Sequence, residues 1–298
     1  MIHTTVAAPE AVATDAVTSK DGTTIGYRRV GTGPGVVVLH GAMESSRSHV
    51  QLAQALAGSF TVYLPDRRGR GLSGPYGAGH SVATDVADMD ALLSKTGAEL
   101  VFGVSSGALI WLHAALVLPG IRKAAIFEPP LLIDRDAALP LISRFDDEIA
   151  RGKIAAALIT GMKAARLGPP FFDRIPRWLL ERMTGAMLAQ EDRRAGPSDV
   201  TMRMLAPTLH YDFQLVLESQ GMLERLAGIP AEVLLLRGSK SPAFLRDSVE
   251  ALARAIPGAE RVELEGLDHA ASGNTTDPMT GKGADPERVA RELRLFFA

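Results

Sequence analysis

Short runs of consecutive apolar residues recur along the chain, and segments with helical spacing separate them. The runs are VVVLH at 36–40, TVYLPD at 61–66, ELVFGVS at 99–105, KAAIFEP at 123–129, AEVLLLRG at 231–238 and RVELEG at 261–266. Runs that are apolar throughout, rather than alternating, are typical of strands covered on both faces of a sheet. The alternating segment 23–31 predicts an earlier strand, antiparallel and at an edge.

Helical patterns lie between these predicted strands. One helix is expected to begin after Ser81, a good N-cap residue, and to end at Gly97. Residues 107–118 are apolar all round, which indicates a buried central helix. Asp285 and Pro286 predict the N-cap and first residue of the last helix. Repeated strand–helix units predict an α/β fold with a doubly wound, mostly parallel sheet.

This alternation breaks between residues 131 and 220. That segment reads as helices rich in Arg, Leu and Met, without a convincing strand, and it is too long for a loop. We therefore expect a helical lid at 131–220, inserted into a core formed by 1–130 and 221–298. Trp178 within the lid is a candidate substrate contact, although ordinary packing of the lid on the core explains its apolar residues equally well.

Composition narrows the possible functions. The 298 residues include no cysteine, which excludes disulfide scaffolds, zinc fingers and a cysteine nucleophile. Charge is nearly balanced, with 32 basic and 34 acidic residues, so neither nucleic acid nor a membrane is an expected partner. The N-terminus lacks a basic start and an apolar core, which predicts no secretory signal and a cytoplasmic location. The uncharged stretch 100–121 is long enough to span a bilayer, but strand, turn and buried helix explain it better.

The candidate chemistry begins at GVSSG, residues 103–107. This G-x-S-x-G match follows an apolar strand and opens an apolar helix, which is the setting of a nucleophile elbow. The helix N-terminus places the Ser106 N–H and a positive dipole beside the hydroxyl of Ser105. The alternative is a glycine-rich turn with incidental serines, and the strand–turn–helix context favours the elbow.

A serine nucleophile needs a base, and His269 is the best placed of the seven histidines. It follows the last predicted strand in GLDHAASG, at the carboxyl edge where sites of parallel sheets form. His40 is interpreted as shaping the turn after its strand. No metal-binding spacing such as H-E-x-x-H occurs, so we predict no metal and no cofactor. The basic cluster at Arg67, Arg68 and Arg70 is expected to be solvated or paired with local acids such as Asp66.

At this point the chain resembles the α/β-hydrolase family over nearly its whole length. HGAMES after one strand, DRRGRGLS after the next, GVSSG, the lid and GLDH carry the resemblance. The catalytic acid that the imidazole requires follows, in many members, the strand corresponding to 231–238. Here Ser241 stands at that position, and we interpret Ser241-Pro242 as the start of a helix.

The alternative acid is Glu128, at the end of the run 123–129. Some family members place their acid there, and one such group, the zearalenone lactonases, pairs a G-x-S-S-G elbow with this glutamate; GVSSGA and IFEPP resemble that pattern. Asp247 and Asp268 are weaker candidates, because Asp247 falls within a helix and Asp268 is too close in sequence to His269. Glu128 is therefore the predicted acid.

Two backbone N–H groups should form the oxyanion hole. Ser106 supplies one and Ala42 the other, with Gly41 or Met43 as alternatives for the second donor. The sequence thus predicts a serine esterase or lactonase that forms an acyl-enzyme on Ser105 with a small apolar substrate.

Other functions stay open. The same fold can carry out C–C bond hydrolysis, lyase chemistry or cofactor-free perhydrolysis, or act as a weakly catalytic small-molecule receptor. The only expected partner is a small-molecule substrate, and the sequence does not decide between a monomer and a homodimer.

Overall fold

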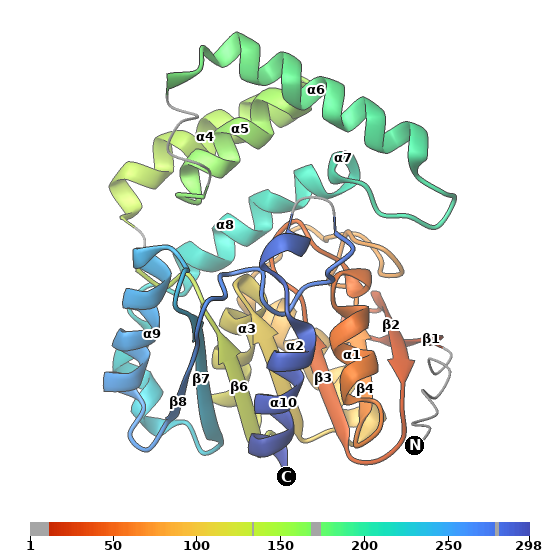
Figure 1. Ribbon diagram of the computed structural model, residues 1–298, viewed down its shortest axis with the longest axis vertical. Coiled ribbons are helices and arrows are strands. Elements are labelled where there is room, and N and C mark those ends of the chain that lie inside the picture. The colour runs from red at the N-terminus through yellow and green to blue at the C-terminus, as the bar shows by residue number, and fades with distance from the viewer. Residues whose placement is uncertain (1–11, 133, 168–173, 278–279) are drawn as a thin grey trace, which may run out of the picture.

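The computed structural model of the protein describes residues 12–132, 134–167, 174–277 and 280–298 (Figure 1). The first residues of the chain, on which the expectation of no secretory signal rests, lie largely outside this range.

One eight-stranded sheet forms the centre of the described structure. Its strands are β1 Ala13–Thr18, β2 Thr24–Val30, β3 Gly35–Leu39, β4 Thr61–Pro65, β5 Leu100–Val104, β6 Lys123–Phe127, β7 Glu232–Gly238 and β8 Glu260–Leu264. The spatial order is β1-β2-β4-β3-β5-β6-β7-β8. All pairs from β4 to β8 are parallel, while β1–β2 and β2–β4 are antiparallel. The six apolar runs are confirmed as strands.

The prediction for the antiparallel strand is only partly right. Residues 24–30 do form an antiparallel strand, but β1 pairs outside it and occupies the edge. Most residues of β1 are exposed, so β1 lacks the apolar run that marks the inner strands. An edge strand with solvent on most sides needs no such run.

Helices cover both faces of the sheet. They are α1 Val50–Leu56, α2 Val82–Thr96, α3 Ser106–Ala115, α9 Ala243–Ala255 and α10 Pro286–Phe297. One core cluster joins the sheet to α1 and α10, and a second joins it to α2, α3 and α9 (Figure 1). This doubly covered parallel sheet confirms the predicted fold class.

The predicted helix ends agree with the structure at two places. Ser81 caps α2 in a capping box, and Gly97 ends it in the left-handed conformation with φ 65°. Asp285 caps α10, where its carboxylate accepts a hydrogen bond from the Arg288 N–H at 3.1 Å.

Helices also fill the segment between β6 and β7. They are α4 Arg135–Ala150, α5 Ile154–Ala164, α6 Arg177–Arg194, α7 Met202–Leu205 and α8 Leu209–Glu218. Among the described residues, short 3-10 helices lie at Ser46–His49, Ala206–Thr208, Met222–Gly228 and Gly281–Gly283. The described part of this segment contains no strand, as expected.

These inserted helices, α4 to α8, form a layer over one edge of the sheet, with α8 nearest to it and α6 outermost (Figure 1). They have a small apolar core of their own, in which the rings of Phe145 and Phe213 pack edge to face at 5.5 Å. Because Phe213 lies on α8, and Leu215 and Val216 of the same helix pack in the core beside α3, this helix joins the inserted layer to the rest of the described structure.

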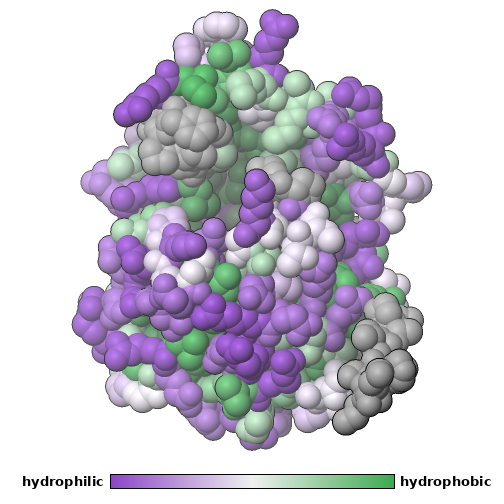
Figure 2. Space-filling view, viewed as in Figure 1, coloured by the Kyte–Doolittle hydropathy of each residue, from purple (hydrophilic) through white to green (hydrophobic). Residues whose placement is uncertain are grey.

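Large hydrophobic side chains reach the surface on the inserted helices. Figure 2 shows hydrophobic residues gathered at the upper end of the molecule, where these helices lie. Exposed members of this segment are Leu132, Leu139, Leu167, Trp178, Met183, Met187 and Met204. No helix in the described ranges is long and apolar enough to cross a membrane, and the uncharged stretch 100–121 forms β5 and α3.

Candidate active site

Ser105 occupies a sharp turn between β5 and α3. Its backbone adopts φ 54° and ψ −124°, a conformation that side chains rarely take and that costs on the order of 1–3 kcal/mol. Two hydrogen bonds hold it there: the Ser105 N–H donates to the Phe127 carbonyl at 2.9 Å, and the Ala108 N–H donates to the Ser105 carbonyl at 3.0 Å. This strained turn is the geometry expected of a nucleophile elbow.

The two glycines of the motif are required by close backbone approach. A Cβ on Gly107 would lie 2.5 Å from the carbonyl oxygens of both Leu39 and His40. A Cβ on Gly103 would lie 2.6 Å from the ring of Trp111. The elbow can therefore pack against β3 and α3 only when both positions lack a side chain.

His269 and Glu128 form a hydrogen-bonded pair. His269 lies in the loop after β8 and Glu128 at the end of β6. The His269 Nδ1 lies 2.7 Å from Glu128 Oε2. The carboxylate is fully buried, and its Oε1 accepts a second hydrogen bond from the Gly238 N–H at 2.6 Å. A buried carboxylate held from both sides can orient an imidazole and stabilise its protonated form.

Phe127 links this pair to the elbow. Its carbonyl accepts the Ser105 N–H, its ring lies nearly parallel to the His269 imidazole at 6.2 Å, and Glu128 is the next residue. Within the described residues no hydrogen bond joins Ser105 Oγ to His269. Such catalytic bonds are often long before substrate binds.

The weaker acid candidates take other positions. The Asp268 carboxylate accepts a hydrogen bond from the Ala270 N–H at 2.9 Å, and Asp247 is exposed on α9. The interpretation of Ser241 as a helix cap is wrong, because α9 begins one residue later and Pro242 is its N-cap. Ser241 instead closes a turn on Gly238, and its buried Oγ has no hydrogen-bond partner in the described structure.

The oxyanion-hole candidates lie on the two loops that flank Ser105. Among the described residues, the N–H groups of Ala42 and Ser106 donate no hydrogen bond, so both can serve a ligand. Gly41 is excluded as a donor, because its N–H already donates to Glu44 Oε2 at 2.6 Å. Met43 adopts φ 56° and stays an alternative to Ala42.

Glu44 is a second carboxylate at the site, which the sequence analysis missed. An ideal Cβ on Gly41 would lie 3.0 Å from Ser105 Cβ and 3.2 Å from Glu44 Oε2, so this carboxylate lies near the serine. Its Oε2 also contacts His49 Nε2 at 3.2 Å. The only sequence signal is an acidic residue in the HGAMES loop after β3.

The Glu44–His49 contact changes the pKa of both groups. Burial raises the pKa of the Glu44 carboxyl, but the His49 imidazole outweighs it and holds the pKa below its ordinary value. Burial lowers the pKa of His49, yet Glu44 and the Ser272 carbonyl outweigh it and raise the pKa above its ordinary value. Each partner therefore favours the charged form of the other.

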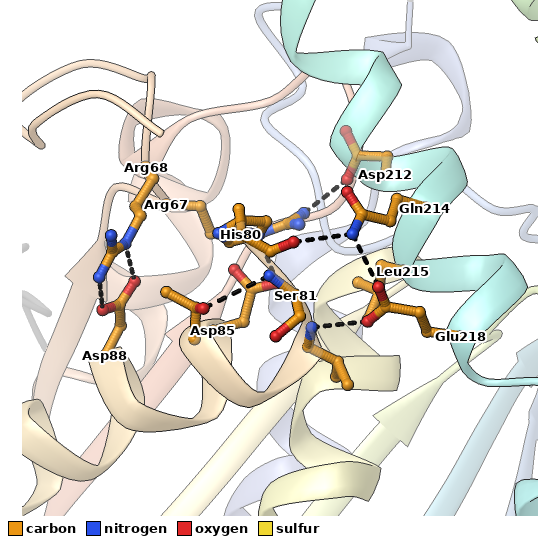
Figure 3. Close-up of polar contacts among 12 residues, drawn as sticks. Arg67, Arg68, His80, Ser81, Asp85, Asp88, Asp212, Gln214, Leu215 and Glu218 are labelled. Atoms are coloured by element: carbon orange, nitrogen blue, oxygen red, sulfur yellow. Dashed lines mark hydrogen bonds and ion pairs between the residues drawn. The ribbon is translucent and has the colours of Figure 1, made fainter. Parts of the chain in front are cut away.

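The arginines of DRRGRGLS are buried, which contradicts the expectation that the cluster is either solvated or paired with local acids such as Asp66. Arg67 and Arg70 pair with Asp212 of α8, and Arg68 pairs with Asp88 of α2 and with Asp21. Figure 3 shows the bonds of Arg67 to Asp212 and of Arg68 to Asp88. The local acid, Asp66, accepts backbone N–H groups instead. Asp212 lies 145 residues from Arg67, and Asp88 lies 20 residues from Arg68, so no partner is a sequence neighbour that the motif could indicate.

His40 shapes its turn as predicted. The Arg67 N–H donates to His40 Nε2 at 3.1 Å, so the ring proton resides on Nδ1, which donates to the Gly41 carbonyl at 2.9 Å. Burial, followed by the charges of Arg70 and Arg67, lowers the pKa of His40 well below its ordinary value. The ring is therefore neutral and its two hydrogen bonds are fixed.

Trp178 lies in the first turn of α6, the outermost inserted helix, and 66% of it is exposed (Figure 1). Among the described residues, no hydrogen bond or ring contact joins Trp178 to Glu128 or His269, so its role as a substrate contact stays a prediction. Within the described residues no group of three or more His, Asp or Glu side chains is arranged to hold a metal ion.

Comparison with known proteins defines the class. The family model described as the alpha/beta hydrolase family matches residues 36–292. The chain belongs to this family, and its fold and elbow agree with that assignment.

Individual relatives share both sequence and fold. A pimeloyl-[acyl-carrier protein] methyl ester esterase of Xanthomonas campestris pv. campestris is 26% identical over 90% of this chain and 97% of its own. The crystal structure of an alpha/beta hydrolase from Sphaerobacter thermophilus is 31% identical, with a TM-score of 0.73 over 95% of this chain and 100% of that one. A thermophilic esterase from Thermogutta terrifontis has a TM-score of 0.69 at 19% identity over 96% of this chain and 98% of that one, which shows likeness of fold.

Proposed function

We propose that the protein is a serine esterase that cleaves a carboxylic ester or lactone through an acyl-enzyme on Ser105. The observation that carries this proposal is the hydrogen bond of His269 to the buried Glu128 carboxylate, a pair joined through Phe127 to the strained serine turn. Esterases among the relatives support the same class.

The residues divide the reaction between them. Ser105 Oγ attacks the ester carbonyl carbon while His269 Nε2 takes the hydroxyl proton. Glu128 holds the Nδ1–H and stabilises the imidazolium that forms. The N–H groups of Ala42 and Ser106 bind the oxyanion, each worth about 10²–10³ in kcat. The tetrahedral intermediate collapses as the proton on His269 passes to the leaving alcohol, and water then hydrolyses the acyl-enzyme by the same steps.

The substrate proposed for this site is small and apolar. The exposed apolar side chains of the inserted helices support this choice, and so does the proposed role of residues 131–220 as a lid on a core of 1–130 and 221–298. Trp178 would meet only the outer end of a substrate that extends from Ser105 toward α6. The position of the acid after β6 favours lactones within the ester class, because of the resemblance to zearalenone lactonases.

Steady-state turnover on a panel of p-nitrophenyl esters and lactones tests the proposal, with Ser105→Ala as the control. Turnover that disappears in the variant supports the serine esterase, and a preference for lactones supports the finer assignment. Equal turnover by wild type and variant would overturn the mechanism. Cleavage of a C–C bond in a diketone, or peracid formation, with no ester turnover would replace esterase chemistry with another reaction of the same fold.

A further inference from the structure

A single buried carboxylate on α8, that of Asp212, binds both the loop after β4 and the start of α3, next to the nucleophile. Asp212 Oδ1 accepts hydrogen bonds from Arg67 Nη1 at 2.7 Å and from Ser106 Oγ at 2.8 Å. Its Oδ2 accepts one from Arg70 Nη2 at 2.5 Å. Asp212 is 3% exposed, and Figure 3 shows its bond to Arg67 spanning the space between α8 and the loop after β4.

Arg70 links Asp212 to the loop after β3, which supplies the Ala42 N–H of the proposed oxyanion hole. Its Nη1 donates to the Gly41 carbonyl at 2.9 Å, where His40 Nδ1 donates as well. The Gly41 carbonyl and the Ala42 N–H belong to one planar peptide unit and point in opposite directions. Two donors that fix the carbonyl therefore also fix the direction of the Ala42 N–H. A cation on the carbonyl further polarises the peptide and strengthens its N–H as a donor.

The second oxyanion donor is held by the same carboxylate. Ser106 supplies its backbone N–H at the start of α3, and its side chain is bonded to Asp212 and also to Arg67 Nη1 at 2.9 Å. The elbow can therefore rotate relative to the Gly41 loop only if one of these buried bonds breaks.

Stability alone is a weak explanation for this cluster. Burying two guanidinium groups and a carboxylate carries a desolvation penalty that their attraction often only offsets. Arg67 also buries its Nε and Nη2 without a hydrogen-bond partner in the described structure. The charged cluster can hold the Gly41 peptide and Ser106 in position through hydrogen bonds, which apolar side chains in its place could not form.

We propose that Asp212 is a positioning residue of the oxyanion hole, which acts through Arg70 on the Ala42 N–H and through Ser106 on the elbow. This inference rests on the proposed serine chemistry. It also makes the inserted helices a structural part of the active site, because α8 supplies the carboxylate.

The same sequence motif provides a matched control. Arg68 Nε and Nη2 donate to Asp88 Oδ2 and Oδ1, both at 2.7 Å, and Asp88 is 2% exposed (Figure 3). This pair is as buried as the pair of Arg70 with Asp212, but it has no hydrogen bond to Gly41 or Ser106. Asp88→Asn therefore removes a buried charge without touching the oxyanion loops.

A fluorophosphonate probe measures the oxyanion hole without knowledge of the natural substrate. Ser105 Oγ forms a bond to phosphorus, fluoride leaves, and His269 takes the hydroxyl proton. Removal of an oxyanion donor costs about 10²–10³ in rate, and a misaligned donor loses part of that. We expect Asp212→Asn to slow the limiting inactivation rate by about 10–100-fold with little change in probe affinity, and Asp88→Asn to stay near wild type. Arg70→Lys, which keeps the charge but loses the fork geometry, should reproduce the loss if Asp212→Asn does not fold.

The outcomes separate the inference from the proposed function. Equal inactivation rates for the Asp212→Asn and Asp88→Asn variants, measured below both Tm values, would overturn the positioning role. A wild-type protein that resists the probe, or a Ser105→Ala variant labelled as fast as wild type, would instead refute the serine chemistry itself. A selective loss of kcat in Asp212→Asn, with KM unchanged, on an ester identified from the panel supports the inference independently.

Discussion

Glu128→Gln is the substitution that tests the acid assignment most directly. Two N–H donors converge on the Glu128 carboxylate, from Gly238 at 2.6 Å and from His269 at 2.7 Å. Glutamine has nearly the same shape but only one acceptor oxygen, so it cannot satisfy both donors. If the oxygen stays on Gly238, the amide NH₂ faces His269 Nδ1 and selects the tautomer with its proton on Nε2. That tautomer cannot accept the proton of Ser105.

The size of the effect follows from this geometry. Loss of the correct tautomer and of the charge that stabilises the imidazolium is worth up to about 10⁴ in kcat, or about 5 kcal/mol in activation free energy. The opposite orientation of the amide leaves the buried Gly238 N–H without an acceptor, which costs about 1–3 kcal/mol of folding free energy. Activity should therefore fall far more than stability does.

The assay compares kcat on the best ester of the panel with Tm by calorimetry. Asp268→Asn and Asp247→Asn serve as controls, and both should stay within about tenfold of wild type, since neither carboxylate contacts His269 in the described structure. The reasoning is refuted if folded Glu128→Gln keeps wild-type kcat. It is refuted equally if one of the control substitutions causes the larger loss.

Three further substitutions test other parts of the structure. Gly107→Ala forces a Cβ against two backbone oxygens and should lower the free energy of unfolding by about 1–3 kcal/mol in denaturant titration. Gly185→Ala has open space around it in α6 and should raise the free energy of unfolding by about 0.5–1 kcal/mol. Equal effects of the two substitutions would contradict the packing argument. Glu44→Gln should lower Tm most between pH 4.5 and 6.5, because the lowered pKa of Glu44 contributes stability above pH 4.5 and the raised pKa of His49 contributes stability below pH 6.5. The difference in Tm between wild type and variant should shrink as pH rises through the His49 pKa or falls through the Glu44 pKa. A difference in Tm that does not vary with pH would count against the ion pair. Trp178→Ala should leave kcat on acetate esters unchanged and raise KM for long acyl chains, so a loss of kcat on acetate would place the indole closer to Ser105 than its exposed position indicates.

The sequence predicted best the elements whose signal is local. Apolar runs marked the inner strands, because burial on both faces leaves no room for polar residues. Ser105 and Glu128 stand at the carboxyl ends of such runs, and His269 lies three residues after the last run, so their place at one sheet edge could be predicted from the chain. The edge strand β1 had no such run and was missed.

Contacts set by tertiary packing could not be predicted in this way. Asp212 lies 142 residues from Arg70, and no spacing rule links a helix in an insertion to a loop after β4. Glu44 was missed for a different reason: its neighbours are close in sequence, but its carboxylate turns back onto the Gly41 N–H. Only the folded backbone shows that this group competes for an oxyanion donor.

The position of the acid on β6 has a consequence for how this enzyme can diversify. In a hydrolase whose acid follows β7, the turn into the next helix cannot change without risk to catalysis. Here the turn supplies the Gly238 N–H to Glu128 and backbone hydrogen bonds to Leu264 and Leu267, and residues 240–242 carry no catalytic side chain in the proposed mechanism. Of these residues Ser241 is buried and Pro242 is the N-cap of α9, whereas the Lys240 side chain is exposed, so Lys240 is the position at which this turn can vary without a change in any group of the proposed mechanism.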